Sequence, residues 1–332
     1  MRKGGGRWPA ASRCPPAARR AVAAVLLAGT AAALGACGGP PPRGGTAAPP
    51  VPAPPARPST GGRSPSRAAG PSGPGPFRPG PSRPGRPRAA RRALAYRYMT
   101  DDGNGRQTAP YGYDLVDLGP YRSLIDALPR GQRALVWIGG YSLASCSFAM
   151  SDAAVRRALA PLAGDPKVAG YYIADEADDA LPAYGGHCPR VVAQVTARSR
   201  LVHRLAPGAF TYEVVTEPGN FAAFAHATDV LGADPYPCLS GRACDWSMIP
   251  RYIAALRAAR IRRYWGVLQA FSDGHWRYPT PAELRAMIRQ WERSGWSGEQ
   301  TFAWSYAGSS LAGHPALLAV LRWLNGGPLG RG

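Results

Sequence analysis

Two adjacent carboxylates, Asp175 and Glu176, directly follow the short apolar and aromatic run Val168–Ala174. An apolar run of this length, bounded by glycine and charge, is typical of a buried strand. In a parallel α/β fold the carboxyl end of a strand faces the ligand side, and burying an unpaired carboxylate is costly. Strand alternation predicts that at most one of the two acids points straight into the site. The pair therefore indicates acid–base chemistry; the alternative is a solvated strand end or a helix N-cap.

Acidic and aromatic residues recur after the other strand-like runs. Asp101 and Asp102 follow the first run, and Asp234 ends the sixth. Candidate substrate contacts at such ends are Trp137, Tyr141, Glu213, Tyr236, Gln269, Trp304 and Tyr306. Acids protonate or attack at a glycosidic bond, and flat rings cover the apolar faces of sugars. Each aromatic residue taken singly more often packs in a core, and Asp234 could also cap backbone in an Asp-Pro-Tyr-Pro turn.

Strand-like and helix-like stretches alternate from residue 93 onward. The expected strands are 93–99, 113–118, 134–139, 168–174, 209–215, 229–233, 264–270 and 300–304. The expected helices are 121–128, 152–162, 189–205, 221–227, 249–259, 281–294 and 315–324. Eight strands alternating with helices predict a (β/α)₈ TIM barrel. An open doubly wound sheet is the alternative, but no glycine-rich phosphate loop follows an early strand.

The helix expected over 281–294 has the clearest local signals. Thr280 precedes Pro281, and Glu283 follows, which is typical of a capped helix start. Leu284, Ile288 and Trp291 then recur at helical spacing, which predicts one buried face.

Four segments together resemble TIM-barrel glycoside hydrolases and their uncharacterised relatives: GYYIADEA at 170–177, DVLGADPYPC at 229–238, YWGVLQAF at 264–271 and FAWSY at 302–306. In retaining members of that superfamily, a glutamate acid/base ends the fourth strand and a glutamate nucleophile ends the seventh. The resemblance implies the first role for Glu176, with Asp175 where asparagine often precedes it. At the seventh strand this sequence has Gln269, which is no nucleophile.

The second carboxylate is therefore open. Asp234 could serve as base or nucleophile, or Glu213 or Glu217 could serve from the fifth strand. The first hypothesis is a glycoside hydrolase-like enzyme acting on a polysaccharide or cell-wall glycan, with catalytic residues Glu176, Asp234 and Asp175. The second is a catalytically inactive barrel that binds glycan at the cell envelope, which the Gln269 departure favours.

A third hypothesis is metal-dependent hydrolysis by Asp101, Asp102 and Asp175. Five histidines without a pair at ligand spacing argue against zinc. We expect no metal and no cofactor, since the sequence has no P-loop, dinucleotide fingerprint or Gly-x-Ser-x-Gly elbow.

The positive charge lies in the N-terminal third. The chain of 332 residues has a net charge of +20, but residues 1–92 hold 16 Lys/Arg and no Asp/Glu. The remaining 24 basic and 20 acidic residues leave 93–332 nearly balanced. We therefore expect no nucleic-acid partner and a monomeric domain over 93–332.

Residues 1–36 have the pattern of an export signal. A basic segment precedes the apolar stretch Ala21–Ala33, which is too short to span a bilayer. Leu34-Gly35-Ala36-Cys37 then resembles the lipobox of bacterial lipoproteins. This predicts lipidation of Cys37 and a protein exported and anchored to the outer face of the bacterial cell membrane. An ordinary signal peptide that leaves a free secreted protein is the alternative.

Residues 37–92 are predicted to be a disordered linker. Over 38–92, 17 prolines and 11 glycines make up half of the residues. Such a composition cannot bury enough apolar surface to fold. Its arginines would favour anionic lipid or wall polymer, or would only keep the linker solvated.

Four cysteines lie in the predicted barrel, an even number that predicts disulfides in an exported domain. Of the three possible pairings we favour Cys238–Cys244, which closes a short local loop, and Cys146–Cys188, which joins loops after neighbouring strands. A metal site is the alternative, but no CxxC motif accompanies these cysteines.

Overall fold

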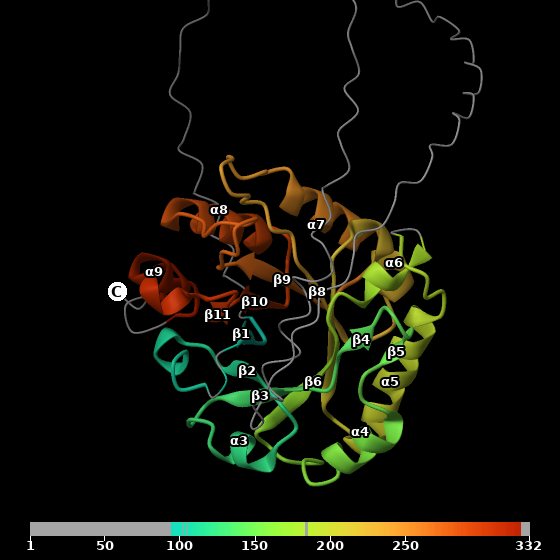
Figure 1. Ribbon diagram of the computed structural model, residues 1–332. Helices are drawn as coiled ribbons and strands as arrows, with labels where there is room; N and C mark the ends of the chain where they lie inside the picture. Colours follow the sequence, from blue (N-terminus) through green and yellow to red (C-terminus); the bar gives the residue numbers. More distant parts are fainter. Residues whose placement is uncertain (1–93, 102, 104, 183–184, 327–332) are drawn as a thin grey trace, which may run out of the picture. The chain divides into compact units, whose positions relative to one another are not determined.

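The computed structural model describes residues 94–101, 103, 105–182 and 185–326. In this part of the chain eight parallel strands close into a barrel in the order β1-β10-β9-β8-β7-β6-β3-β2, surrounded by helices (Figure 1). The barrel strands are β1 (Arg97–Met99), β2 (Leu115–Leu118), β3 (Arg133–Trp137), β6 (Val168–Ala174), β7 (Phe210–Val215), β8 (Val230–Ala233), β9 (Tyr264–Gln269) and β10 (Gly298–Phe302). The predicted (β/α)₈ barrel is confirmed, and an open sheet is excluded because β1 pairs with β10. The predicted signal peptide and linker lie outside the described residues.

The helices that cover the barrel occur where the sequence predicts them. They are α3 (Arg122–Asp126), α4 (Asp152–Leu159), α5 (Val191–Leu205), α6 (Phe221–Phe224), α7 (Met248–Ala258), α8 (Pro281–Glu292) and α9 (Pro315–Leu324). Thr280 and Glu283 form the predicted capping box of α8, and Leu284, Ile288 and Trp291 are fully buried. Two hairpins were not predicted: β4 (Tyr141–Ser142) with β5 (Ser147–Phe148), and β11 (Ser305–Tyr306) with β12 (Ser309–Ser310).

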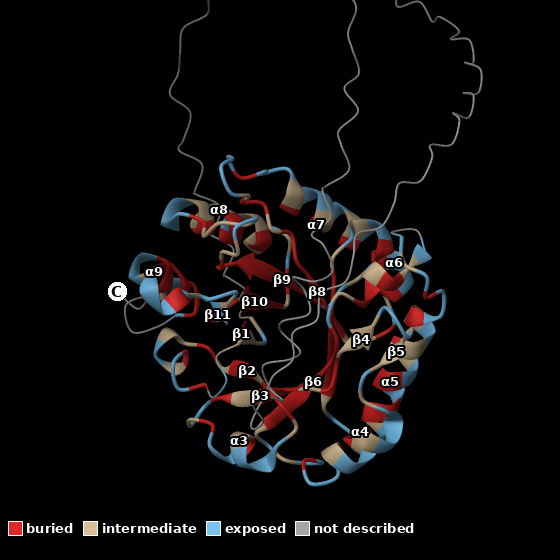
Figure 2. Cartoon of the chain, viewed as in Figure 1, coloured by how far each residue is buried: buried red, intermediate tan, exposed pale blue. Residues whose placement is uncertain are grey.

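Figure 2 shows the burial expected of this fold, with buried strands at the centre and exposed surfaces on the outer helices. The hydrophobic core has two layers. One lies between strands and helices, and the other fills the barrel with large aromatic side chains. Tyr98 of β1 contacts Tyr172, Tyr212 and Trp265 at ring-centroid distances of 6.2–6.4 Å. Their strands β6, β7 and β9 are not neighbours of β1, so these contacts cross the barrel interior. The barrel is a packed core, as its fold requires.

Gly170 of β6 has no room for a side chain. A Cβ there would lie 2.5 Å from the backbone carbonyl oxygen of Phe210 on β7. We expect Gly170→Ala to lower the free energy of unfolding by about 1–3 kcal/mol, because backbone on a central strand must move. Thermal and urea unfolding measure this. Gly313→Ala is the matched control, because a Cβ there meets nothing within 4 Å, and it should be neutral or slightly stabilising. Equal stability of the two variants would contradict the assigned packing.

Candidate active site

The acid pair at the end of β6 does not follow simple strand alternation. The pairing of β6 with β7 shifts register between Tyr172 and Ala174, and Ala174 packs in the outer core layer. Asp175 consequently lies on the same side as Tyr172, whose hydroxyl donates a hydrogen bond of 2.6 Å to its Oδ1. Tyr172 belongs to the barrel interior, so Asp175 lies at the carboxyl-end opening of the barrel, hereafter the mouth.

Glu176 is half-buried and has an unusual backbone conformation. Its φ of 49° and ψ of 35° lie in the left-handed region, and it precedes the 3₁₀ turn η2 (Ala177–Ala180). Its backbone N–H donates to the carbonyl oxygen of Val214 on β7 at 3.1 Å. A non-glycine residue in this region is uncommon and calls for a reason.

Asp234 and Tyr236 follow β8, and Asp234 is buried. The pKa of Tyr236 is raised well above its usual value, first by desolvation and then by the negative charges of Asp234, Glu176 and Asp175. The same charges from Asp234 and Asp175 raise the pKa of Tyr212 inside the barrel, again after burial. The segments after two non-adjacent strands, β6 and β8, therefore hold three of the predicted acids whose charges act on one tyrosine.

Asp101 and Asp117 extend this acidic group toward β1 and β2. Asp101 has a φ of 60°, and its backbone N–H donates to Asp117 Oδ1 at 2.9 Å. Burial, followed by Asp117 and Asp175, raises the pKa of Asp101 to about 8. Asp117 was not singled out in the sequence, although a charge inside a short apolar strand was a usable signal. Asp102 lies outside the described residues.

Aromatic side chains surround the mouth. Trp137, at the end of β3, packs edge-on against Tyr172 at 4.6 Å between ring centroids. Tyr236 contacts Phe271 at 5.0 Å and Trp276 at 5.6 Å, and Tyr306 contacts Phe271 at 5.2 Å. Trp137, Tyr236 and Tyr306 are half-buried. Trp276, in the loop after β9, was missed because no strand-end pattern marks it.

Three other residues that were predicted to contact substrate have their side chains bonded away from the mouth. The Tyr141 hydroxyl donates to Gln194 Oε1 on α5 at 2.5 Å. Glu213 is buried on the face of β7 opposite to Tyr212 and accepts from Thr228 Oγ1 at 3.2 Å. Trp304 packs beside Tyr111, and its Nε1–H donates to Gln107 Oε1 at 2.7 Å. These contacts place the three side chains among the surrounding helices and loops.

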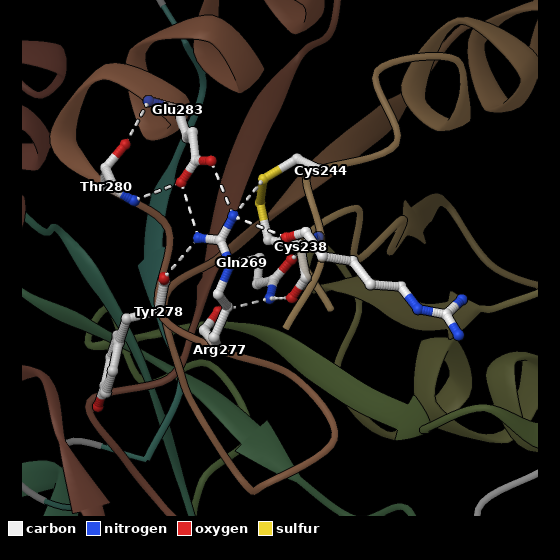
Figure 3. The surroundings of a disulfide bond; sticks show 8 residues. Cys238, Cys244, Gln269, Arg277, Tyr278, Thr280 and Glu283 are labelled. Carbon is white, nitrogen blue, oxygen red and sulfur yellow. Dashed lines mark hydrogen bonds and ion pairs between the residues drawn. A yellow bond between two sulfur atoms is a disulfide. The ribbon is translucent and has the colours of Figure 1, made fainter. Parts of the chain in front are cut away.

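Gln269 at the end of β9 is fully buried, and backbone groups occupy its amide (Figure 3). Its Oε1 accepts from the Cys238 N–H, and its Nε2 donates to the carbonyl oxygens of Cys238 and Arg277, all at 2.9 Å. Arg277 forms a two-pronged ion pair with Glu283, both distances 2.8 Å, which lowers the pKa of Glu283 to about 2. Gln269 thus joins the loops after β8 and β9 beneath the mouth.

Both predicted disulfides, Cys146–Cys188 and Cys238–Cys244, are formed. Among the described residues, groups of three possible metal ligands within 4.8 Å of one another are Cys146–His187–Cys188 and Cys238–Cys244–Glu283, and each contains a disulfide. Asp101 and Asp175 are not part of such a group.

The sequence matches no protein-family model and no curated protein. Solved structures do resemble the barrel. The β-galacturonidase from Eisenbergiella tayi bound to galacturonate has a TM-score of 0.51 and 11% identity, covering 70% of this chain and 51% of that one. The β-mannanase from the blue mussel Mytilus edulis has a TM-score of 0.48 and 12% identity, covering 70% and 92%. The Bacteroides uniformis β-glucuronidase 2 has a TM-score of 0.48 and 12% identity, covering 67% and 31%.

The chain spans about a third of that glucuronidase and half of the galacturonidase. At such identities the likeness shows the fold, a (β/α)₈ barrel of the kind found in TIM-barrel glycoside hydrolases, and so confirms the fold implied by the sequence resemblance. Within the described residues, the structure contains no helix of the length and apolarity needed to cross a membrane.

Proposed function

We propose that the barrel hydrolyses O-glycosidic bonds in an extracellular or cell-wall glycan. The observation that supports this most strongly is that three acids from the ends of β6 and β8, Asp175, Glu176 and Asp234, all raise the pKa of Tyr236 at the carboxyl end of a closed barrel, after burial. TIM-barrel enzymes carry their active sites at this end, and glycosidases need a pair of carboxyl groups there.

In this proposal Glu176 is the general acid that protonates the leaving oxygen. In an inverting reaction Asp234 activates a water molecule, and the two carboxyl groups are separated by about 6.5–9.5 Å. In a retaining reaction Asp234 attacks the sugar directly, and the separation is about 5–5.5 Å. Asp175, held by Tyr172, adds negative charge that favours an oxocarbenium-like transition state.

A glycan-binding barrel without turnover is the second candidate. Gln269 supports it, because β9 ends in an amide bonded to backbone rather than in a carboxylate. Both candidates predict glycan binding, and they differ in whether a bond is broken.

The test uses the chain from residue 38 onward, offered a panel of neutral, acidic and amino polysaccharides. Release of reducing ends, measured together with calorimetric binding, separates the candidates. Reducing ends above the level of a Glu176→Gln sample support hydrolysis. Binding without release of reducing ends after long incubation supports the glycan-binding barrel without turnover. The absence of both binding and release would refute both candidate functions.

Trp137 offers a prediction for binding, because its half-buried ring lies at the mouth beside Tyr172. We expect Trp137→Ala to weaken binding of the glycan found in the panel by about 5- to 30-fold, since an aromatic contact is worth about 1–2 kcal/mol. Calorimetry measures the change. Trp323→Ala is the control, because Trp323 is exposed on α9 in the outer helix layer. Equal affinities of both variants would remove Trp137 from the site.

We further propose that the protein is exported and lipid-anchored through Cys37, with 37–92 as a spacer between membrane and barrel. The two disulfides support an oxidising compartment. Mass spectrometry of the N-terminal peptide from cells tests this: a diacylglyceryl group on Cys37 is expected, and an unmodified mature terminus would contradict it.

A further inference from the structure

A buried carboxylate, Asp178, makes most of the side-chain contacts between the turn that follows Glu176 and the loop after β7. Asp178, the second residue of η2, is fully buried, and its side chain reaches across to the loop after β7. It accepts from the backbone N–H groups of Thr216 and Glu217 at 3.1 and 3.0 Å. It also accepts from the Thr216 hydroxyl at 3.1–3.2 Å and from Asn220 Nδ2 at 2.9 Å.

These partners compensate for a burial that is otherwise unfavourable. Burial raises the pKa of Asp178, and the hydrogen bonds from Asn220, Glu217 and Thr216 oppose that shift. A buried carboxylate that loses such donors leaves an unpaired charge or takes up a proton, and either event costs free energy. The contact is thus specific for a carboxylate in both geometry and charge.

The same turn is held on its other side. The Cys188 N–H donates to the Ala180 carbonyl oxygen at 2.9 Å, and Cys188 is joined to Cys146 in the β4–β5 hairpin. The segment after Glu176 is therefore anchored to the loops that follow both neighbouring strands, β7 and β3.

Glu176 itself has a reason to need this support. Its left-handed backbone costs roughly 1–2 kcal/mol for a residue with a side chain. Such a conformation persists only where surrounding contacts determine it. Relaxation of φ to a negative value would change the direction in which the Glu176 side chain leaves the backbone.

We propose that Asp178 is a positioning residue, which holds the backbone of Glu176 in the left-handed conformation and thereby aims its carboxylate at the mouth. The catalytic part of this inference rests on the proposed hydrolase function, whereas the structural part does not. Asp178 touches no reacting atom in this role and acts through the turn.

The test compares Asp178→Asn with a matched control at the opposite end of the barrel. Asp229 precedes β8, and its Oδ2 accepts from the N–H and hydroxyl of Thr211 at 2.8 and 3.1 Å. Asp229 also pairs with His203 Nε2 at 3.1 Å and is about a third exposed, so Asp229→Asn makes the same chemical change to a less buried side-chain-to-backbone contact far from the mouth. Asn220→Ala, which removes one of the Asp178 donors, is the milder variant if Asp178→Asn does not fold.

The first readout needs no substrate. The chain contains six glutamates, so ¹³Cδ-glutamate labelling yields six side-chain carboxyl resonances, of which Glu176→Gln assigns one. We expect the Glu176 resonance to shift or broaden in Asp178→Asn, and less so in Asn220→Ala, while it is unchanged in Asp229→Asn. An unchanged Glu176 resonance in a folded Asp178→Asn protein, or in Asn220→Ala if only that variant folds, would overturn the inference.

The second readout is turnover of the glycan that the panel identifies. We expect Asp178→Asn to lower kcat at least tenfold with KM within twofold, while both constants of Asp229→Asn stay near wild type. If Asp178 only stabilises the fold, the folded fraction should fall in both Asp178→Asn and Asp229→Asn, and the kcat of each folded molecule should equal that of wild type. If no glycan is turned over, the proposed hydrolase function fails and the resonance test of Asp178 still stands.

Discussion

Replacing Glu176 with glutamine should abolish most glycan hydrolysis while leaving the fold intact. A glutamine amide has nearly the same shape but cannot donate a proton to the leaving oxygen. General acid catalysis contributes typically about 10²–10⁴-fold, so we expect kcat to fall by that factor with KM little changed. Initial rates of reducing-end release measure it, and calorimetric affinity should remain within about threefold.

Glu292→Gln is the matched control for this experiment. Glu292 is a half-buried glutamate at the last position of α8 in the outer helix layer. Full activity of Glu176→Gln would refute the assignment of the acid. Comparable losses in both glutamine variants would mean that the substitution acts on folding and not on chemistry.

Replacing Glu299 with glutamine should remove a large pH dependence of stability. Glu299 lies on β10, fully buried, and accepts weakly from Thr301 Oγ1 at 3.5 Å. Burial raises the pKa of Glu299 from 4.5 to about 8. The charge of Arg97 opposes this shift, and the charge of Asp114 adds to it. The folded protein therefore keeps a proton that the unfolded chain releases above about pH 4.5.

The sign of the effect follows from this difference in bound protons. The contribution of protonated Glu299 to the stability of the folded protein is fully present below about pH 4.5, and it is lost as the pH rises toward about 8. One such group changes the free energy of unfolding by up to about 1.4 kcal/mol per pH unit. We expect Glu299→Gln to match wild type near pH 4.5 and to be more stable by several kcal/mol at pH 9.

Urea unfolding between pH 4.5 and 9 measures this difference. Asp101, whose pKa is also raised to about 8, contributes a slope of the same sign that remains in the variant. Glu217→Gln, on an exposed side chain at the end of β7, controls for the substitution itself. Parallel stability curves for wild type and Glu299→Gln would show that Glu299 does not keep its proton in the folded protein.

The eight strands and seven helices were predictable because their signals are local. Hydrophobic period, capping residues and chain breaks depend on a few neighbouring positions, as at Thr280, Pro281 and Glu283. The Cys146–Cys188 disulfide was predictable from the order of the strands along the chain, because the two cysteines lie in loops after the neighbouring strands β3 and β6.

The direction of the side chains at the strand ends was harder to predict from the sequence. Alternation predicts which face a residue occupies only while the register is regular, and the shift in β6 moves Asp175 to the side of Tyr172. Glu213 shows the reverse case: alternation within β7 turns it toward the helices, but strand-end position alone could not exclude it from the site.

The sequence by itself determined a barrel that places carboxylates and aromatic rings at the ends of its strands, since these properties follow from local periodicity and order along the chain. Only the tertiary structure decided which side chains meet. Asp234 and Glu176 lie at the ends of β8 and β6, which both pair with β7, and both charges act on Tyr236. Glu176 has a left-handed backbone, and Asp178 bonds the turn that follows it to the loop after β7. Such long-range contacts and backbone irregularities arise from packing between strands, which no single stretch of sequence encodes.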